Sequence, residues 1–287
     1  AQGTASPLRF YSPTNEHEAV GLHANRNHYA SFLVVGLICT FGGVILHAST
    51  QKPGSQRVLQ MFGWLLMCAI LMLGVFLSRS RAALGLAAIM SAFMLLLVFL
   101  GGRRIRSATR WLPLIVIVGG LIAVEFGFNR IASRFDNLDG GQRTDVLPHI
   151  LDLTRQFGAT GTGVGSFPAV YEAFAPVQDL GPKIVNHAHN DWAEIWIDVG
   201  VPALAVLAVF VSWYWRRLLE LRADWRTGRR ENAERLVGAL IILSLCLHSL
   251  VDYPLRTTSL SCVFALACLL MLRPARGPSS PNGEWTS

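Results

Sequence analysis

The sequence predicts an all-α, polytopic helical membrane protein, and two features support this fold class. Of the 287 residues, 52% are apolar and only 15% are charged, whereas about a quarter of the residues in a soluble domain carry a charge. Several apolar stretches approach the ~20 residues that a helix needs to cross a hydrocarbon core of ~30 Å. Helices are the expected form of these stretches, because lipid offers no hydrogen-bond partner to unpaired backbone groups.

Seven apolar stretches are expected to be transmembrane helices. Four lie within residues 29–128 and three within residues 192–272, and a long polar loop, residues 129–191, separates the two groups. Residues 1–28 form a further polar loop, and residues 273–287 form a tail with the composition of a disordered segment. The predicted spans are residues 29–47, 60–77, 82–100, 111–128, 192–215, 236–251 and 257–272.

The long loop at residues 129–191 exceeds what a connector needs, which indicates that it carries function. Within it, residues 143–157 place Val146, Ile150, Leu153 and Phe157 at helical spacing, predicting a short amphipathic helix. Ser166, followed by Phe-Pro, predicts the N-cap of a second short helix.

Basic residues gather on one side of this predicted topology. With seven spans, one side carries 15 basic and 5 acidic residues, and the other carries 10 and 13. The positive-inside rule assigns the basic side to the cytoplasm. The loop at 129–191 therefore faces outward, the tail is cytoplasmic, and the net charge of +7 requires no nucleic-acid partner.

The segment His187-Ala-His189-Asn190-Asp191 lies where the outer loop re-enters the membrane. A neutral imidazole there is a plausible general base near neutral pH. A metal site would use both histidines and Asp191, but no further His or Cys cluster completes it, and the five cysteines all lie in apolar stretches. No metal or cofactor is therefore expected; ordinary interfacial polarity is the alternative interpretation.

Three arginines are the second candidate element. Arg79 and Arg81 stand at the outer end of the second predicted span, and Arg143 begins the predicted loop helix. Arginine at a membrane edge is often a snorkelling anchor. Anchors of this kind are less expected on the outer face of this chain, because its basic residues gather on the opposite, cytoplasmic side. Guanidinium groups also bind phosphate oxygens in a bidentate manner. Together with His189, they indicate a diphosphate site beside a base.

The segment Gly161-Thr-Gly163-Val-Gly165 has the spacing G-x-G-x-G and no surrounding βαβ unit, so it is not a dinucleotide fingerprint. It is either a simple tight turn or a turn whose amides face an anion.

Five further polar residues lie beside or inside predicted spans. Asp191, Glu194 and Asp198, at i, i+3 and i+7, share one helix face, and buried acids in a membrane usually face the bundle interior. These acids either pair with the three candidate arginines, or have a functional role in orienting His189 or binding sugar. His248 and Asp252, at i and i+4, either pair structurally or line the same cavity.

Five segments match, in order, the motifs of one known family. They are GLHANRNHYASFL from Gly21, Ser80-Arg81-Ala82, Arg143 with the helix and GTGVGSF that follow, HAHNDWAEIWIDVG, and HSLVDYPL. In these segments the chain resembles the O-antigen ligase and O-antigen polymerase superfamily, membrane glycosyltransferases that use polyprenyl-diphosphate-linked saccharides. Asp198 stands where this family often has Glu, and Ala203 where it often has Gly. The family usually has more than seven spans, which implies further N-terminal ones.

The resemblance implies a metal-independent, inverting transfer of a saccharide from a polyprenyl-diphosphate carrier to an acceptor hydroxyl, at the periplasmic face of the bacterial inner membrane. His189 would be the catalytic base, and Arg81 and Arg143 would hold the diphosphate. The acceptor would be lipid A-core for a ligase or a growing glycan for a polymerase. The residues expected to bind substrate are Arg79, Gly163, Gly165, His187, Asn190, Asp198, His248 and Asp252.

A polysaccharide transporter or flippase is the alternative function. Such proteins favour broken helices at mid-membrane and inverted repeats. The polar residues of this chain instead gather at one face and no repeat is visible, which favours the enzyme.

Overall fold

The computed structural model describes residues 19–48, 54–100, 142–176, 184–224 and 230–272. Within these ranges the regular elements are helices, and no strand is present. The all-α part of the predicted fold class is therefore confirmed.

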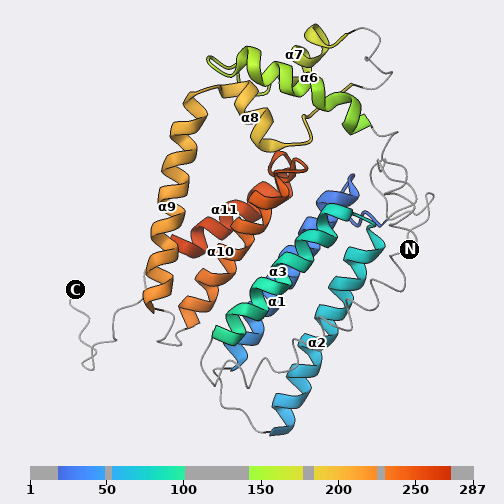
Figure 1. Ribbon diagram of the computed structural model, residues 1–287. Coiled ribbons are helices and arrows are strands. Elements are labelled where there is room, and N and C mark those ends of the chain that lie inside the picture. Colours follow the sequence, from blue (N-terminus) through green and yellow to red (C-terminus); the bar gives the residue numbers. More distant parts are fainter. Residues whose placement is uncertain (1–18, 49–53, 101–141, 177–183, 225–229, 273–287) are drawn as a thin grey trace, which may run out of the picture.

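Six long helices form a bundle (Figure 1): α1 (Arg26–Ala48), α2 (Gly54–Leu77), α3 (Arg81–Leu100), α9 (Pro202–Asp224), α10 (Arg230–His248) and α11 (Thr258–Leu272). Two of them are central, because α1 packs on α2, α3 and α10, while α10 packs on α9, α11 and α3. Their shared core buries large apolar side chains, among them Ile38, Phe41, Ile242 and Leu245.

A second, smaller layer lies across one end of the bundle, at the top of Figure 1. It consists of α6 (Gln142–Phe157), α7 (Phe167–Phe174), α8 (Asp191–Val199) and the segment 184–190, and we call it the loop layer. It has a hydrophobic cluster of its own, centred on Ile150, Leu153, Phe167, Tyr171 and Ile197. The 3-10 turn η4 (Pro254–Arg256), between α10 and α11, contacts α8 and so joins the two layers.

Five predicted spans correspond to helices with shifted ends: residues 29–47, 60–77, 82–100, 236–251 and 257–272 become α1, α2, α3, α10 and α11. The predicted span at 111–128, the tail at 273–287 and residues 1–18 of the predicted loop at 1–28 lie outside the described residues. The end of that loop is shorter than predicted, because α1 begins at Arg26.

The prediction of one continuous helix over residues 192–215 is wrong. The chain breaks between α8 and α9, where Gly200 has a φ of +68° and Pro202 opens the next helix. Glycine readily takes a positive φ because it has no Cβ, and proline disfavours helix at the residue before it. Apolar residues continue on both sides of the break, so hydropathy alone did not reveal it.

The amphipathic helix predicted over 143–157 is confirmed as α6, which buries Ile150 and Leu153 in the loop layer. Ser166 directly precedes α7, as predicted, but its side chain makes no capping hydrogen bond. The Ser166 hydroxyl donates instead to the Gly163 carbonyl at 2.7 Å, so it stabilises the preceding turn.

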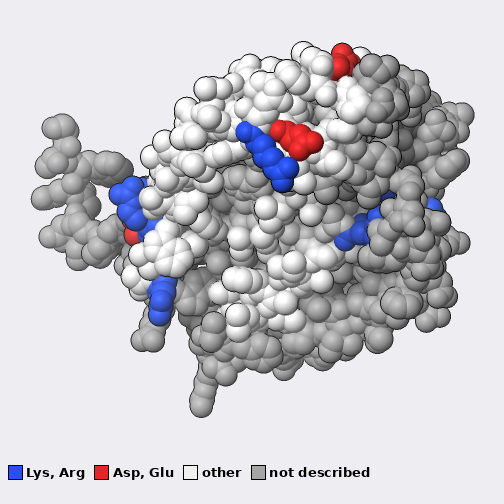
Figure 2. Space-filling view, turned by 45° about the horizontal axis from the view of Figure 1, so that its top comes forward, with Lys and Arg blue, Asp and Glu red and all other residues white. Residues whose placement is uncertain are grey.

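Two described helices are long and apolar enough to cross a membrane, namely Arg26–Leu46 and Gly54–Leu77. Arg81–Leu97 and Thr258–Leu272 are apolar but shorter. Length and composition alone identify these candidates, so the count of seven spans stays a prediction. Figure 2 shows that Lys, Arg, Asp and Glu are sparse on the described surface of the face it presents.

Candidate functional site

His187, His189, Asn190 and Asp252 meet where the loop layer rests on the bundle. The segment 184–190, the start of α8, the turn after α10 and the start of α1 all contribute. Tyr253 marks the centre of this junction, because its ring lies against three imidazoles. The ring centroids are 4.4 Å from His187, 4.8 Å from His28 and 5.1 Å from His189.

Asn190 fixes the segment that carries the two loop histidines. Its side-chain oxygen accepts hydrogen bonds from the amides of Trp192 and Ala193, both at 3.0 Å, which makes it the N-cap of α8. Its amide group donates to the Leu250 carbonyl at 2.9 Å. One side chain therefore starts α8 and ties it to the turn after α10.

His189, next to Asn190, has a backbone φ of +52°, an uncommon conformation for a residue with a side chain. Its Nδ1 lies 3.5 Å from Asp252 Oδ1, and the side chain is 34% exposed. Asp252 is fully buried, and its Oδ2 accepts a hydrogen bond from the Asn27 side-chain amide. The chain Asn27–Asp252–His189 thus connects α1, the turn after α10 and the loop layer.

His187 and the backbone beside it are held by Glu194. The His187 Nδ1 lies 3.0 Å from Glu194 Oε1, and the Ala188 amide donates to Glu194 Oε2 at 2.9 Å. Glu194 is buried, and both of its oxygens contact the histidine segment.

The three acids on one face of α8 converge on Arg256, which comes from η4. The guanidinium lies 3.7 Å from the Asp191 carboxylate, 3.4 Å from that of Glu194 and 3.4 Å from that of Asp198. The acids are 1–2% exposed, and Arg256 is 21% exposed. The arginine that these acids contact is Arg256, which the sequence analysis did not single out. Pairing with Arg79, Arg81 or Arg143 stays a prediction.

A signal for Arg256 was present in the sequence. Three acids on one helix face require a counter-charge in an apolar chain, and Arg256 follows Asp252 within the same short turn. The turn joins two predicted spans at the outer end, so its basic residue lies on the same side as the acids.

Asp191 is fixed by a fuller set of partners than the other two acids. Burial raises the pKa of its carboxyl group, and hydrogen bonds from the Ser249 hydroxyl at 2.7 Å and the Leu255 amide at 3.2 Å oppose that shift, as does the Arg256 charge. Its backbone amide donates to the Ser249 carbonyl at 3.0 Å. The first residue of α8 is thereby anchored to the turn after α10.

The glycine-rich turn at residues 161–165 packs against the end of α8. The Gly163 amide donates to the Asp198 carbonyl at 2.8 Å, and the Gly165 amide donates to the Asp198 carboxylate at 3.1 Å. The anion that the turn faces is thus a side chain of this protein. A role of Gly163, Gly165 and Asp198 in substrate binding stays a prediction.

Two glycines allow this turn to approach α8 so closely. A Cβ on Gly161 would lie 2.6 Å from the Asp198 carbonyl oxygen, and a Cβ on Gly200 would lie 2.6 Å from the Gly161 nitrogen. Both residues also have a positive φ. Any side chain at either position would separate two backbone segments that contact directly.

The segment Ser78-Arg79-Ser80-Arg81 places its serines inward and Arg81 outward, at the end of the bundle that carries the loop layer (Figure 1). Ser80 is buried and its hydroxyl accepts a hydrogen bond from the Ala83 amide at 3.3 Å, capping α3. Arg79 has a φ of +52°, and Arg81 is exposed. Arg143 lies in the first turn of α6, and its side chain lies outside the described part.

His248, the remaining candidate, is buried between two bundle helices. Its Nδ1 forms a hydrogen bond with the Ser31 hydroxyl of α1, so its observed contact ties α10 to α1. Among the described residues, no group of three or more His, Cys, Asp or Glu side chains is arranged to hold a metal ion.

We expect Arg256→Gln to lower the free energy of unfolding by about 3–5 kcal/mol, because it leaves three buried carboxylates without their counter-charge. Arg155→Gln is the control, since Arg155 and its partner Asp152 are exposed and such pairs contribute less than about 1 kcal/mol. Denaturant unfolding of the detergent-purified protein measures both. Equal losses in the two variants would contradict the proposed importance of the Arg256 cluster.

Comparison with known proteins identifies the family of this chain. The family described as O-antigen ligase matches residues 66–208, about half of the chain. The match begins within α2, contains Arg79, Arg81, His187 and His189, and ends within α9. Neither the search of curated proteins nor the search of solved structures gives a match. The chain belongs to the O-antigen ligase family, whose function lies in polysaccharide biosynthesis.

Proposed function

We propose that this protein transfers a saccharide from a polyprenyl-diphosphate carrier to an acceptor hydroxyl, with His189 as the general base. The observation that carries the proposal is the position of His189: its Nδ1 faces the buried carboxylate of Asp252, while a third of the side chain is exposed. The family implies lipid-linked saccharide and glycan substrates in general, and the site offers a base that such an acceptor can reach.

In the proposed reaction, His189 Nε2 removes the proton from the acceptor hydroxyl as its oxygen attacks the anomeric carbon. The new glycosidic bond forms while the bond from that carbon to the diphosphate oxygen breaks, and the diphosphate leaves with the bonding electrons. A single displacement of this kind inverts the anomeric centre. A general base contributes about 10²–10⁴-fold to such a step, and the Asp252 carboxylate stabilises the imidazolium that forms.

Arg81 and Arg143 hold the diphosphate in this proposal, and Arg79 lies beside Arg81. Guanidinium groups stabilise the negative charge that grows on the leaving group, and their fork geometry suits phosphate oxygens. Since diphosphate is already a good leaving group, this stabilisation is sufficient without a metal ion.

The apolar surface and the charge distribution support a membrane assignment. Large apolar side chains are exposed on bundle helices, including Phe62 and Ile70 on α2 and Val206 and Val209 on α9. Lipid chains are the natural environment for such a surface. We propose a multi-pass protein of the bacterial inner membrane, with the loop layer on the periplasmic face and the basic loops in the cytoplasm.

We expect His189→Ala to lower transfer by about 10²–10⁴-fold with the fold intact, because it removes the base. The assay uses purified protein in detergent with a polyprenyl-diphosphate saccharide, in one tube with lipid A-core and in another without added acceptor. A single transfer that depends on lipid A-core indicates a ligase, and a ladder without it indicates a polymerase. Absence of product in both tubes with folded wild type would contradict the proposal.

His149→Ala is the control for that substitution, because His149 lies on α6 and packs on Tyr171 in the loop layer rather than on Tyr253. It should keep the wild-type rate within about twofold, as expected for a position outside the reaction. A comparable loss in both variants would assign the effect of His189→Ala to folding.

Asp252→Asn should lower kcat by about 10²-fold or more with little change in KM, because the amide no longer stabilises the imidazolium. The substitution keeps the size of the side chain and one oxygen for the Asn27 amide. Steady-state kinetics over a range of donor concentrations separates kcat from KM. An unchanged kcat in Asp252→Asn would contradict the proposal that Asp252 stabilises the imidazolium of His189.

Arg81→Lys and Arg143→Lys should each lose at least about tenfold in transfer, because an ammonium cannot form the bidentate contact with diphosphate. Arg155→Lys, at an exposed position of α6, is the control and should keep the wild-type rate. Transfer should also persist in EDTA. Near wild-type turnover of both variants, or restoration of an EDTA-treated enzyme by a divalent ion, would contradict the arginine-based mechanism.

A further inference from the structure

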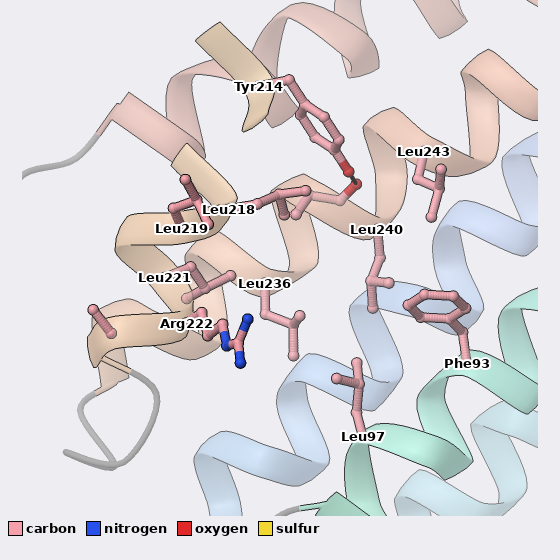
Figure 3. A pocket seen from close by; sticks show the side chains of 12 residues that line it. Phe93, Leu97, Tyr214, Leu218, Leu219, Leu221, Arg222, Leu236, Leu240 and Leu243 are labelled. Atoms are coloured by element: carbon pink, nitrogen blue, oxygen red, sulfur yellow. Dashed lines mark hydrogen bonds between the residues drawn. The ribbon is translucent and has the colours of Figure 1, made fainter. Parts of the chain in front are cut away.

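A cavity of about 920 Å³ lies between α3, α9 and α10. Its lining comes mainly from apolar side chains, among them Phe93 and Leu97 of α3, Leu218 of α9, and Leu240 and Leu243 of α10, and Figure 3 shows these side chains directed toward a common space. Its volume lies in the upper part of the ~300–1,000 Å³ range of small-molecule sites.

The cavity is remote from the proposed catalytic site. The α9 residues that line it lie in the second half of that helix, whereas Pro202, at its start, follows α8 directly. At a rise of 1.5 Å per residue, Leu218 lies roughly 24 Å along α9 from Pro202. A ligand in this cavity therefore does not contact His189 or the loop layer.

The lining offers almost no hydrogen-bonding groups to a ligand. The Tyr214 hydroxyl, which could have served a polar molecule, donates to the Ala239 carbonyl at 2.9 Å (Figure 3). An apolar cavity of this kind does not hold ordered water well, because water needs two or more polar partners. The chemistry of the walls therefore fits a hydrocarbon chain.

Arg222 adds a positive charge to this apolar lining. It lies in the last turn of α9, is exposed, and has no ion-pair partner among the described residues. The nearby acid Glu220 is already engaged, with Arg217 at 2.9 Å and Arg235 at 3.1 Å. A lipid whose hydrocarbon chain occupies the cavity would therefore bring its headgroup to the Arg222 guanidinium, which favours an anionic headgroup.

We propose that the cavity binds an acyl chain of an anionic phospholipid, with its phosphate at Arg222. The acyl chain fills the space between α3 and α9 and so holds α9 in place, since α9 packs mainly on α8 and α10 in the described part. The site goes beyond the proposed glycosyl transfer and does not depend on it. It lies on the side that the charge distribution assigns to the cytoplasmic leaflet.

Photo-crosslinking in lipid nanodiscs tests this inference. The probes are phosphatidylglycerol and phosphatidylethanolamine, each with a diazirine in the same acyl chain, and mass spectrometry maps the labelled peptides. We expect phosphatidylglycerol to label peptides of α9 and α10 at least about threefold more than phosphatidylethanolamine does, because only it carries a net negative charge. No donor or acceptor is present, so failure of glycosyl transfer would not affect the result.

Two pairs of variants locate the bound lipid. Leu240→Trp fills the cavity and should lower the labelling of α9 and α10 about tenfold, whereas Leu204→Trp, on the exposed surface of the same bundle, should not. Arg222→Glu should abolish the preference for phosphatidylglycerol, whereas Arg216→Glu, which is exposed on α9 but does not line the cavity, should keep it.

Folding of each variant is checked by its thermal transition, and Leu218→Phe replaces Leu240→Trp where the latter does not fold. Labelling that a folded cavity-filling variant leaves unchanged would overturn the site. Equal labelling of the wild-type protein by the two lipid probes would overturn the assignment of an anionic headgroup. A preference for phosphatidylglycerol that persists in Arg222→Glu would overturn it as well.

Discussion

The ion-pair cluster of Arg256 with Asp191, Glu194 and Asp198 is the interaction on which the rest of the site depends. It connects η4, which belongs to the bundle, with α8, which belongs to the loop layer. Each carboxylate also makes a second contact, since Asp191 binds the turn after α10, Glu194 holds the His187 segment, and Asp198 receives the glycine-rich turn. Because buried carboxylates are costly without a counter-charge, one guanidinium stabilises all three arrangements together.

The positions of the histidines follow from this arrangement. The two layers have separate hydrophobic cores, so apolar packing alone leaves their relative placement weakly determined, and polar contacts at the junction supply the specificity. His189 takes its left-handed backbone conformation between the N-cap Asn190 and the Asp252 carboxylate, which lies 3.5 Å from its Nδ1. Strained conformations of this kind persist only where the surroundings determine them, as they do at this junction.

The Asn27–Asp252–His189 chain also explains a motif at the start of α1. The Asn25 side-chain oxygen accepts a hydrogen bond from the Asn27 backbone amide at 2.8 Å, at the start of the helix. The Asn27 side-chain amide donates to the Asp252 carboxylate. One asparagine therefore has a local role and the other a long-range role. Their spacing in the sequence gives no indication of this division, because the partner of Asn27 lies 225 residues away.

The sequence by itself determined the all-α class, the positions of most bundle helices and the amphipathic helix α6, because these follow from the spacing and length of apolar stretches. Its motifs also indicated the family that the comparison then showed. Only the tertiary structure separated α8 from α9 and identified Arg256 as the partner of the three acids. It also showed that the glycine-rich turn donates a hydrogen bond to the Asp198 carboxylate. Those outcomes depend on contacts between segments that are distant in the sequence. Apolar periodicity predicts which residues are buried, but it does not predict which residues they contact.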